Sequence, residues 1–320
     1  MTLIYNAAQM VPGAMERIQP YIRQTMLDPS TYYSQRTGAD VYFKCENLQH
    51  TGSFKVRGAL NKILSLNEEE RRRGIVTAST GNHGAACAYA LQQIGARGIV
   101  FVPETAVETK LAAIRRRGAE IRTFGLDSIE TEKHAREFAI AHGMTYVPPY
   151  NDPLVVAGQG TIAVELLHQL PNIDAVFISV GGGGLIGGIA SLLKLARLDI
   201  EVFGCSPENS QVMAQSILAG EILDLPSLPT LSDGTVGGVE PESITFPLCR
   251  DYVDQYISVS EEEIASSLRD FMGAQHQLIE GSAAVSIAAF LKAADQLQNS
   301  RVAIVLCGAN ISLQTLKEIL

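Results

Sequence analysis

The chain has 320 residues, 46% of them hydrophobic, and a formal net charge of −9 at pH 7. This length is enough for two domains or for one large α/β domain, and the negative charge argues against a general nucleic-acid or anionic-membrane surface. Its five cysteines are widely spread and include no CxxC pair, which indicates free thiols in a reducing compartment.

Short apolar strands alternate with amphipathic helices along the chain. A first strand is predicted at 41–46, and a helix starts at Lys55. Further strands are predicted at 74–78, 98–102, 120–124, 175–179, 201–204 and 301–306, with helices at 82–94, 107–117, 128–142 and 189–198. This alternation predicts an α/β fold with parallel sheets flanked by helices.

Two proline-rich stretches interrupt the pattern, at 148–153 and at 226–247. We therefore expect a smaller domain at 50–146, set within a larger domain formed by residues 1–49 and 147–320. The first residues show no basic segment followed by a long apolar run, and no apolar run is long enough to span a membrane. We expect a cytoplasmic protein without membrane or nucleic-acid partners.

A run of four glycines, VGGGGL at 180–185, follows the predicted strand 175–179. Glycines let successive backbone N–H groups point at a ligand, and the following helix adds its positive end. A flexible linker is the alternative, but linkers rarely lie between a buried strand and an apolar helix. The run lacks the GxxxxGK[ST] spacing of a nucleoside-triphosphate loop, so it favours a phosphate cradle of another kind.

A second strand-to-helix turn, STGNHG, spans 79–84. Its side chains suit helix capping, whereas its backbone N–H groups and its hydroxyls suit the binding of a carboxylate, so both interpretations stay open.

Lys55, in HTGSFKVRGA, is either a helix lysine reaching water or an amine whose pKa is lowered by burial and by the helix N-terminus. An amine, a phosphate site and a carboxylate site together are what an enzyme using pyridoxal 5′-phosphate (PLP) needs.

Three further residue types carry alternatives. Cys307, in LCGAN, can be interpreted simply as a small buried residue. The functional alternative is that it faces the pyridine nitrogen of PLP, where a thiol would favour elimination over transamination. Glu280 opens a predicted helix and can complement its dipole. His50 and His83 lack metal-ligand spacing and are interpreted as structural.

These motifs resemble the fold-type II PLP enzymes, in particular the serine/threonine dehydratase and serine racemase group. HTGSFKVRGA, STGNHG, VGGGGL and CGAN occur in that family's order and spacing, and the likeness runs over nearly the whole chain. The resemblance implies a two-domain fold of the tryptophan synthase β type, a homodimer, and closure of the mobile small domain over a small-molecule amino-acid substrate.

The resemblance also implies roles for the site residues. Lys55 holds PLP covalently and then exchanges protons at the substrate α-carbon. Phe54 packs near the cofactor ring, Asn82 hydrogen-bonds the ring hydroxyl oxygen, Glu280 lies near the cofactor, and Cys307 replaces the usual serine beside the pyridine nitrogen. The phosphate is bound by Gly181, Gly182, Gly183, Gly184 and Leu185, and the substrate carboxylate is surrounded by Ser79, Thr80, Gly81, Asn82 and His83.

Three departures from the family refine this expectation. Thr80 stands where many dehydratases have alanine and racemases have a serine that serves the second face of the α-carbon. The segment 206–212 lacks acids at the positions matching the racemase cation ligands, so we predict no metal there. SPENSQVM and LSDGTVGGVEPESITFPLCR are most similar to the hydroxyectoine-utilisation dehydratases.

The resulting hypothesis is a PLP-dependent ammonia-lyase that converts a β-hydroxy amino acid to a 2-oxo acid and ammonia. The substrate is threonine- or serine-like, or an amino acid derived from hydroxyectoine. A serine or aspartate racemase is the alternative within enzymes, and Thr80 is the residue that distinguishes it. A non-catalytic module that binds a phosphate ligand is the alternative of another class.

Overall fold

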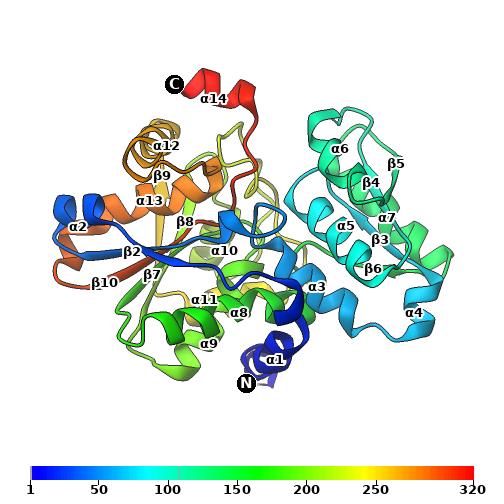
Figure 1. The fold of residues 1–320 in the computed structure, drawn as a ribbon, viewed down its shortest axis with the longest axis horizontal. Helices are drawn as coiled ribbons and strands as arrows, with labels where there is room; N and C mark the ends of the chain where they lie inside the picture. Colours follow the sequence, from blue (N-terminus) through cyan, green and yellow to red (C-terminus); the bar gives the residue numbers. More distant parts are fainter. Residues whose placement is uncertain (1, 107) are drawn as a thin grey trace.

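Two mainly parallel sheets, each covered by helices, organise the chain (Figure 1). The computed structural model describes residues 2–106 and 108–320; Val107, in the predicted helix 107–117, lies outside the described residues. The expected α/β arrangement is confirmed. Within these residues, no helix combines the length and the apolar character needed to cross a bilayer.

The larger sheet has six strands in the order β1-β2-β10-β7-β8-β9. Strand β1 is antiparallel to β2, and the remaining neighbours are parallel, with Val302 opposite both Val41 and Ala175. Its strands are β1 (Leu27–Pro29), β2 (Asp40–Lys44), β7 (Ala175–Ser179), β8 (Glu201–Pro207), β9 (Gln255–Val259) and β10 (Arg301–Val305).

Helices cover this sheet on both faces and bury most of the core. The inner strands are mostly apolar and buried, as a sheet covered on two sides requires. The helices of this part of the chain are α1 (Thr2–Ile18), α2 (Thr31–Thr37), α8 (Pro153–Gln169), α9 (Gly184–Ala196), α10 (Val212–Ala219), α11 (Thr245–Tyr252), α12 (Glu261–Gln275), α13 (Gly281–Ala293) and α14 (Leu313–Ile319).

The smaller sheet has four parallel strands in the order β5-β4-β3-β6. One face packs against α5 and α6 through residues such as Val100 and Ile114, and the other packs against α7 through Phe101 and Ala139. The elements are α3 (Lys55–Ser65), α4 (Glu68–Arg73), β3 (Ile75–Ala78), α5 (Asn82–Ile94), β4 (Gly98–Val102), α6 (Glu108–Arg115), β5 (Glu120–Thr123), α7 (Ser128–Ala141) and β6 (Thr145–Tyr146).

Helix α3 lies between the two sheets (Figure 1) and crosses α8 at a contact between glycines. A Cβ on Gly158 would lie 2.6 Å from the Cα of Gly58, a distance that no side chain tolerates. The Gly58 N–H donates to Gln159 Oε1 at 3.2 Å across this contact. The crossing therefore fixes the start of α3, which carries Lys55, against the large sheet's helical layer.

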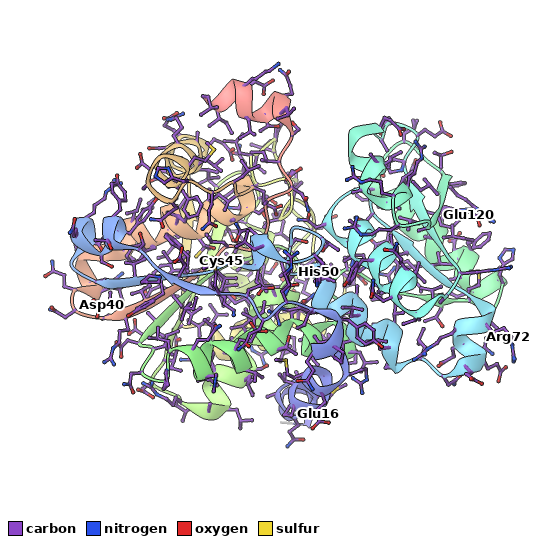
Figure 2. All side chains as sticks on the ribbon, in the orientation of Figure 1. Glu16, Asp40, Cys45, His50, Arg72 and Glu120 are labelled. Carbon is purple, nitrogen blue, oxygen red and sulfur yellow. The ribbon has the colours of Figure 1, made fainter. Side chains whose placement is uncertain are left out.

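The carboxyl ends of the strands bring the glycine-rich loops together, as expected for parallel sheets. Strand β2 runs from Asp40 at the outer edge toward Cys45 near the middle of the molecule (Figure 2). The segments that follow β2, β7 and β10 carry Lys55, Gly181–Gly184 and Cys307, and the segment after β3 carries Ser79–His83.

Several predicted bounds are wrong by a few residues. The helix expected at 189–198 begins at Gly184 and ends at Ala196, because tertiary packing overrides the low helix propensity of its glycines. Pro247 lies inside α11 rather than in the irregular segment, since a proline is tolerated in the first turn of a helix. Pro153 likewise begins α8, capped by Asp152.

Candidate active site

Lys55 is the first residue of α3, at the end of a loop that is bonded to the segment after β10. The Phe54 N–H donates to the Cys307 carbonyl at 3.0 Å, and the Ala309 N–H donates to the Gly52 carbonyl at 2.9 Å. Gly52 has φ +73°, which favours glycine at this turn. The lysine and Cys307 are thus held close together although they are far apart in sequence.

The Lys55 amine has no counter-ion among the described residues. Its Nζ donates to the Pro149 carbonyl at 2.9 Å and lies 5.3 Å from the centre of the Phe54 ring. Lys55 keeps some solvent contact, but burial of the surrounding site lowers its pKa to about 8, while Cys307, Cys87 and Glu280 act in the opposite direction. A neutral, nucleophilic amine is therefore accessible near neutral pH.

Residues Ser79–His83, here called the Ser79–His83 loop, join β3 to α5, include the first two residues of that helix and leave space beside their backbone. A Cβ on Gly81 would meet no atom within 4 Å, and the Gly81 N–H donates to Ser79 Oγ at 3.1 Å. Thr80 is partly exposed. Buried His83 holds the loop by donating from Nε2 to the Val147 carbonyl at 3.0 Å, and burial lowers its pKa to about 3, so its ring stays neutral.

Asn82 connects this loop to Glu280, the residue before α13. Its Nδ2 donates to both Glu280 carboxylate oxygens, at 3.0 and 3.1 Å, and its Oδ1 accepts from Asn310 Nδ2. The Asn310 N–H donates to Glu280 Oε2 at 3.0 Å. Burial raises the pKa of Glu280 to about 7 despite these hydrogen bonds. Asn82 is thus linked directly to the CGAN segment.

Cys307 lies beside this carboxyl group, with its Sγ 3.9 Å from Glu280 Oε1. Burial, followed by the nearby Glu280, raises the pKa of Cys307 well above its ordinary value, so the group remains a thiol. Gly308 is needed at the next position, because its Cβ would lie 2.5 Å from Glu280 Oε2.

The glycine run forms a narrow turn into α9. Gly183 adopts φ +81° and precedes the helix, whose first-turn N–H groups have no partners within the helix. A Cβ on Gly182 would lie 2.6 Å from the Tyr150 ring, and Thr245 Oγ1 donates to the Gly182 carbonyl at 2.6 Å. The turn is therefore held from outside, and its shape depends on the absence of side chains.

These features fit PLP. The glycine turn supplies backbone donors and a helix N-terminus for a phosphate, Lys55 supplies a desolvated primary amine, and the Ser79–His83 loop has open space for an amino-acid carboxylate. The structure brings Lys55 close to Phe54 and Cys307, and Asn82 close to Glu280. The glycine turn is connected to the lysine through the neighbouring residues Pro149 and Tyr150.

Comparison with known proteins agrees with this chemistry. Residues 18–308 match the family described as pyridoxal-phosphate dependent enzyme, and the chain belongs to that family. It is 38% identical over 310 residues to the L-threonine ammonia-lyase of Thermotoga maritima, covering 97% of this chain and 77% of that protein.

Solved structures give the same result. Maize serine racemase superposes with a TM-score of 0.92 at 32% identity, over 97% of this chain and 95% of that one. The processed threonine deaminase isoform 2 of Solanum lycopersicum superposes with a TM-score of 0.93 at 31% identity, over 98% and 92%. The predicted fold type, cofactor and lyase class are confirmed, and the non-catalytic binding module is wrong.

Sequence reasoning missed several residues that shape the site. Tyr150 packs on the glycine turn, and its hydroxyl accepts from the Glu240 N–H at 2.8 Å. Arg136 of α7 pairs with Glu240 at 2.9 Å and so connects the small sheet's outer helix to the long loop before α11. Neither contact has a local sequence signal.

His50 stacks on Tyr89, with ring centres 5.3 Å apart. No cluster of three metal-ligating side chains occurs in residues 2–106 and 108–320.

Gly182→Ala tests the glycine turn. The new methyl group would strike the Tyr150 ring, so the turn must shift, and we expect PLP affinity to fall by about tenfold or more. An absorbance titration with PLP measures the change. Gly273→Ala in α12 is the matched control, because its Cβ enters open space. Unchanged affinity in Gly182→Ala would contradict a phosphate role for this turn.

Proposed function

We propose that this enzyme converts a threonine- or serine-like β-hydroxy amino acid to a 2-oxo acid and ammonia. The observation that carries the proposal is the Lys55 amine, which has a lowered pKa and lies beside Cys307 in a site with a glycine turn and an open carboxylate loop. The ammonia-lyase named above supports the reaction class.

The chain's own groups supply position and proton transfer. When bound, PLP supplies an electron sink for the bond that breaks at the substrate α-carbon. We propose that N–H groups of the Ser79–His83 loop hold the substrate carboxylate and that the Lys55 amine takes the α-proton. The β-hydroxide leaves and, with the proton taken from the α-carbon, accounts for one water, which gives an enamine; hydrolysis of the enamine releases ammonia and the 2-oxo acid. The water lost in the first step balances the water used in the second.

Cys307 accounts for elimination rather than transamination in this proposal. A thiol with a raised pKa cannot act as the carboxylate that would keep a pyridine nitrogen protonated. We place Cys307 beside that nitrogen and Phe54 along the ring. Asn82, oriented by Glu280 and Asn310, is placed at the ring hydroxyl.

We also propose that residues 50–146 form a mobile domain that closes over the substrate, and that the protein is a homodimer. The proposed domain boundary is bridged near the site by Asn82–Glu280 and Arg136–Glu240 contacts. Both are polar contacts that can break and re-form during closure.

A hydroxyectoine-derived amino acid remains our narrower substrate proposal.

Replacing Lys55 tests the proposed ammonia-lyase reaction. Lys55→Ala should lose keto-acid formation by at least about a hundredfold, since the proposed base is gone. Keto acid and ammonia are measured with threonine, serine, 3-hydroxyaspartate and a hydroxyectoine-derived amino acid, and the fastest of the four identifies the preferred substrate. Lys62→Ala is the control, because it removes another lysine of α3, paired with Asp152 at 2.7 Å. Turnover retained in Lys55→Ala would refute the role.

A racemase is the second candidate, favoured by Thr80, a partly exposed residue that carries a hydroxyl, and by the likeness to serine racemase. If this hydroxyl serves the second face of the α-carbon, Thr80→Ala loses D-serine formation and keeps elimination, whereas Thr80→Ser keeps both. Chiral chromatography and a keto-acid assay measure the two products. Wild-type protein that makes no D-serine would contradict the racemase. D-serine formation at the wild-type rate in Thr80→Ala would contradict the role of Thr80.

A further inference from the structure

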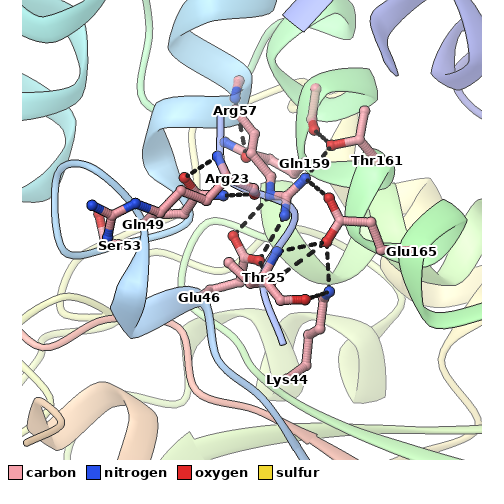
Figure 3. Close-up of polar contacts among 12 residues, drawn as sticks. Arg23, Thr25, Lys44, Glu46, Gln49, Ser53, Arg57, Gln159, Thr161 and Glu165 are labelled. Atoms are coloured by element: carbon pink, nitrogen blue, oxygen red, sulfur yellow. Dashed lines mark hydrogen bonds and ion pairs between the residues drawn. The ribbon is translucent and has the colours of Figure 1, made fainter. Parts of the chain in front are cut away.

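A fully buried group of four charged side chains lies behind the segment between Glu46 and Arg57, which contains Lys55 and which we call the lysine loop (Figure 3). We call this group the ionic quartet: Lys44 of β2, Glu46 after it, Arg57 of α3 and Glu165 of α8. None of the four touches the groups assigned above to the cofactor or the substrate. Its two cations and two carboxylates balance in charge, so the quartet carries no net charge that a ligand would have to neutralise.

Every member of the quartet has well-formed partners. Arg57 makes a two-point contact with Glu46, from Nε to Oε2 and from Nη2 to Oε1, both at 2.8 Å. Its Nη1 donates to Glu165 Oε1 at 2.7 Å and to Thr161 Oγ1 at 3.1 Å. This fork geometry is specific to arginine.

The other half of the quartet uses all three donors of a buried amine. Lys44 Nζ donates to Glu165 Oε2 at 2.5 Å, to the Thr25 carbonyl at 2.8 Å and to Gln169 Oε1 at 2.8 Å. Thr25 Oγ1 donates to Glu46 Oε1 at 2.6 Å and so connects the two halves.

Such a network is a poor source of stability by itself. Removing charges from water costs several kcal/mol per ion, and well-packed apolar replacements are often as stable. What the quartet provides is geometry, because it fixes the relative positions of a strand end, a loop and two helices. The contact between Glu46 and Arg57 encloses the segment that lies between them.

That segment carries Lys55. Glu46 and Arg57 are eleven residues apart in sequence, and their two-point contact closes the loop that contains Lys55. The opposite side of the loop is bonded to the CGAN segment through Phe54 and Cys307. Behind it, the contact between Gly58 and Gly158 lets Arg57 reach Thr161 and Glu165.

We propose that Arg57, through Glu46, is a positioning residue that holds the Lys55 amine in its desolvated place. The proposal rests on the role of Lys55 in the proposed function. The pair acts at a distance, by fixing both ends of the lysine loop, and it touches no reacting atom. Without the pair, the loop should open more often and the amine should become more exposed to water than it is in the structure.

The test uses replacements that leave no charge unpaired. Glu46→Gln with Arg57→Met removes one anion and one cation, and Glu165 keeps Lys44 and the Thr25 N–H. The matched control is Lys194→Met with Asp254→Asn, which removes another buried lysine's ion pair, remote from the lysine loop. The asparagine amide of that control can still accept from the Val202 N–H, as the Asp254 carboxylate does.

Two readouts are needed, one of them without cofactor. In PLP-free protein, we expect amide hydrogen exchange of residues 47–56 to accelerate by about tenfold or more in the Glu46/Arg57 double variant. With PLP and substrate, we expect kcat to fall by about tenfold while KM stays within about threefold. The control should change neither, whatever it does to the melting temperature.

The outcomes separate this proposal from the proposed function. Faster exchange at 47–56 in the Glu46/Arg57 variant supports positioning even if wild-type protein turns over no tested substrate. Exchange and kcat equal to those of the control would overturn it. Should the double variant not fold, Arg57→Lys decides by the same readouts, because a lysine keeps the charge but loses the two-point contact. Wild-type exchange and kcat in Arg57→Lys would overturn the proposal.

Discussion

The structure depends on one primary amine that is largely shielded from water and that has no carboxylate within ion-pair distance in the described part of the chain. A lysine placed this way loses solvation that an ion pair would otherwise replace, so its neutral form becomes accessible near neutral pH. The carbonyl of Pro149 gives Lys55 a hydrogen bond without restoring the missing charge. The contacts that hold the surrounding segments in place must offset the free energy lost when this amine is desolvated.

Those contacts come from opposite sides of the lysine loop. In front, backbone hydrogen bonds join Phe54 to Cys307, and Glu280 joins Asn82 to Asn310. Behind, the ionic quartet closes the loop at Glu46 and Arg57. The chain therefore places two kinds of charged group near one another: a lysine with no counter-ion among the residues that the structure describes, and an arginine with two. The lysine suits covalent chemistry, and the arginine suits rigid support of the loop that contains the lysine.

Much of this arrangement follows from local sequence patterns. Helix α5 and strands β4 and β7 have the predicted bounds, because apolar runs and glycine turns mark their ends. The segments carrying Lys55, Gly182 and Cys307 could be grouped in advance, since the parallel strands of one sheet present their carboxyl ends at the same edge. Asn82 follows β3 of the small sheet, so its place depends on how the two sheets meet.

Other features could not be predicted, for physical reasons. Lys44 and Glu46 look like ordinary charges at a strand end, and the partner Glu165 is 121 residues away from Lys44. Tyr150 shapes the glycine turn only through packing, which leaves no periodic signal. The start of α9 was missed because glycines, poor helix formers, form its first turn when strands and neighbouring helices bury them.

The central claim is that burial makes the Lys55 amine reactive. The most direct measurement is competitive labelling of PLP-free protein with an amine-reactive reagent at a series of pH values, followed by mass spectrometry of the peptide that contains Lys55. Exposed lysines of the same protein report the reagent's own pH dependence. A protonated amine does not react, so labelling should rise with pH, with a midpoint of about 8. A midpoint near 10.5, the ordinary value for lysine, would contradict the account.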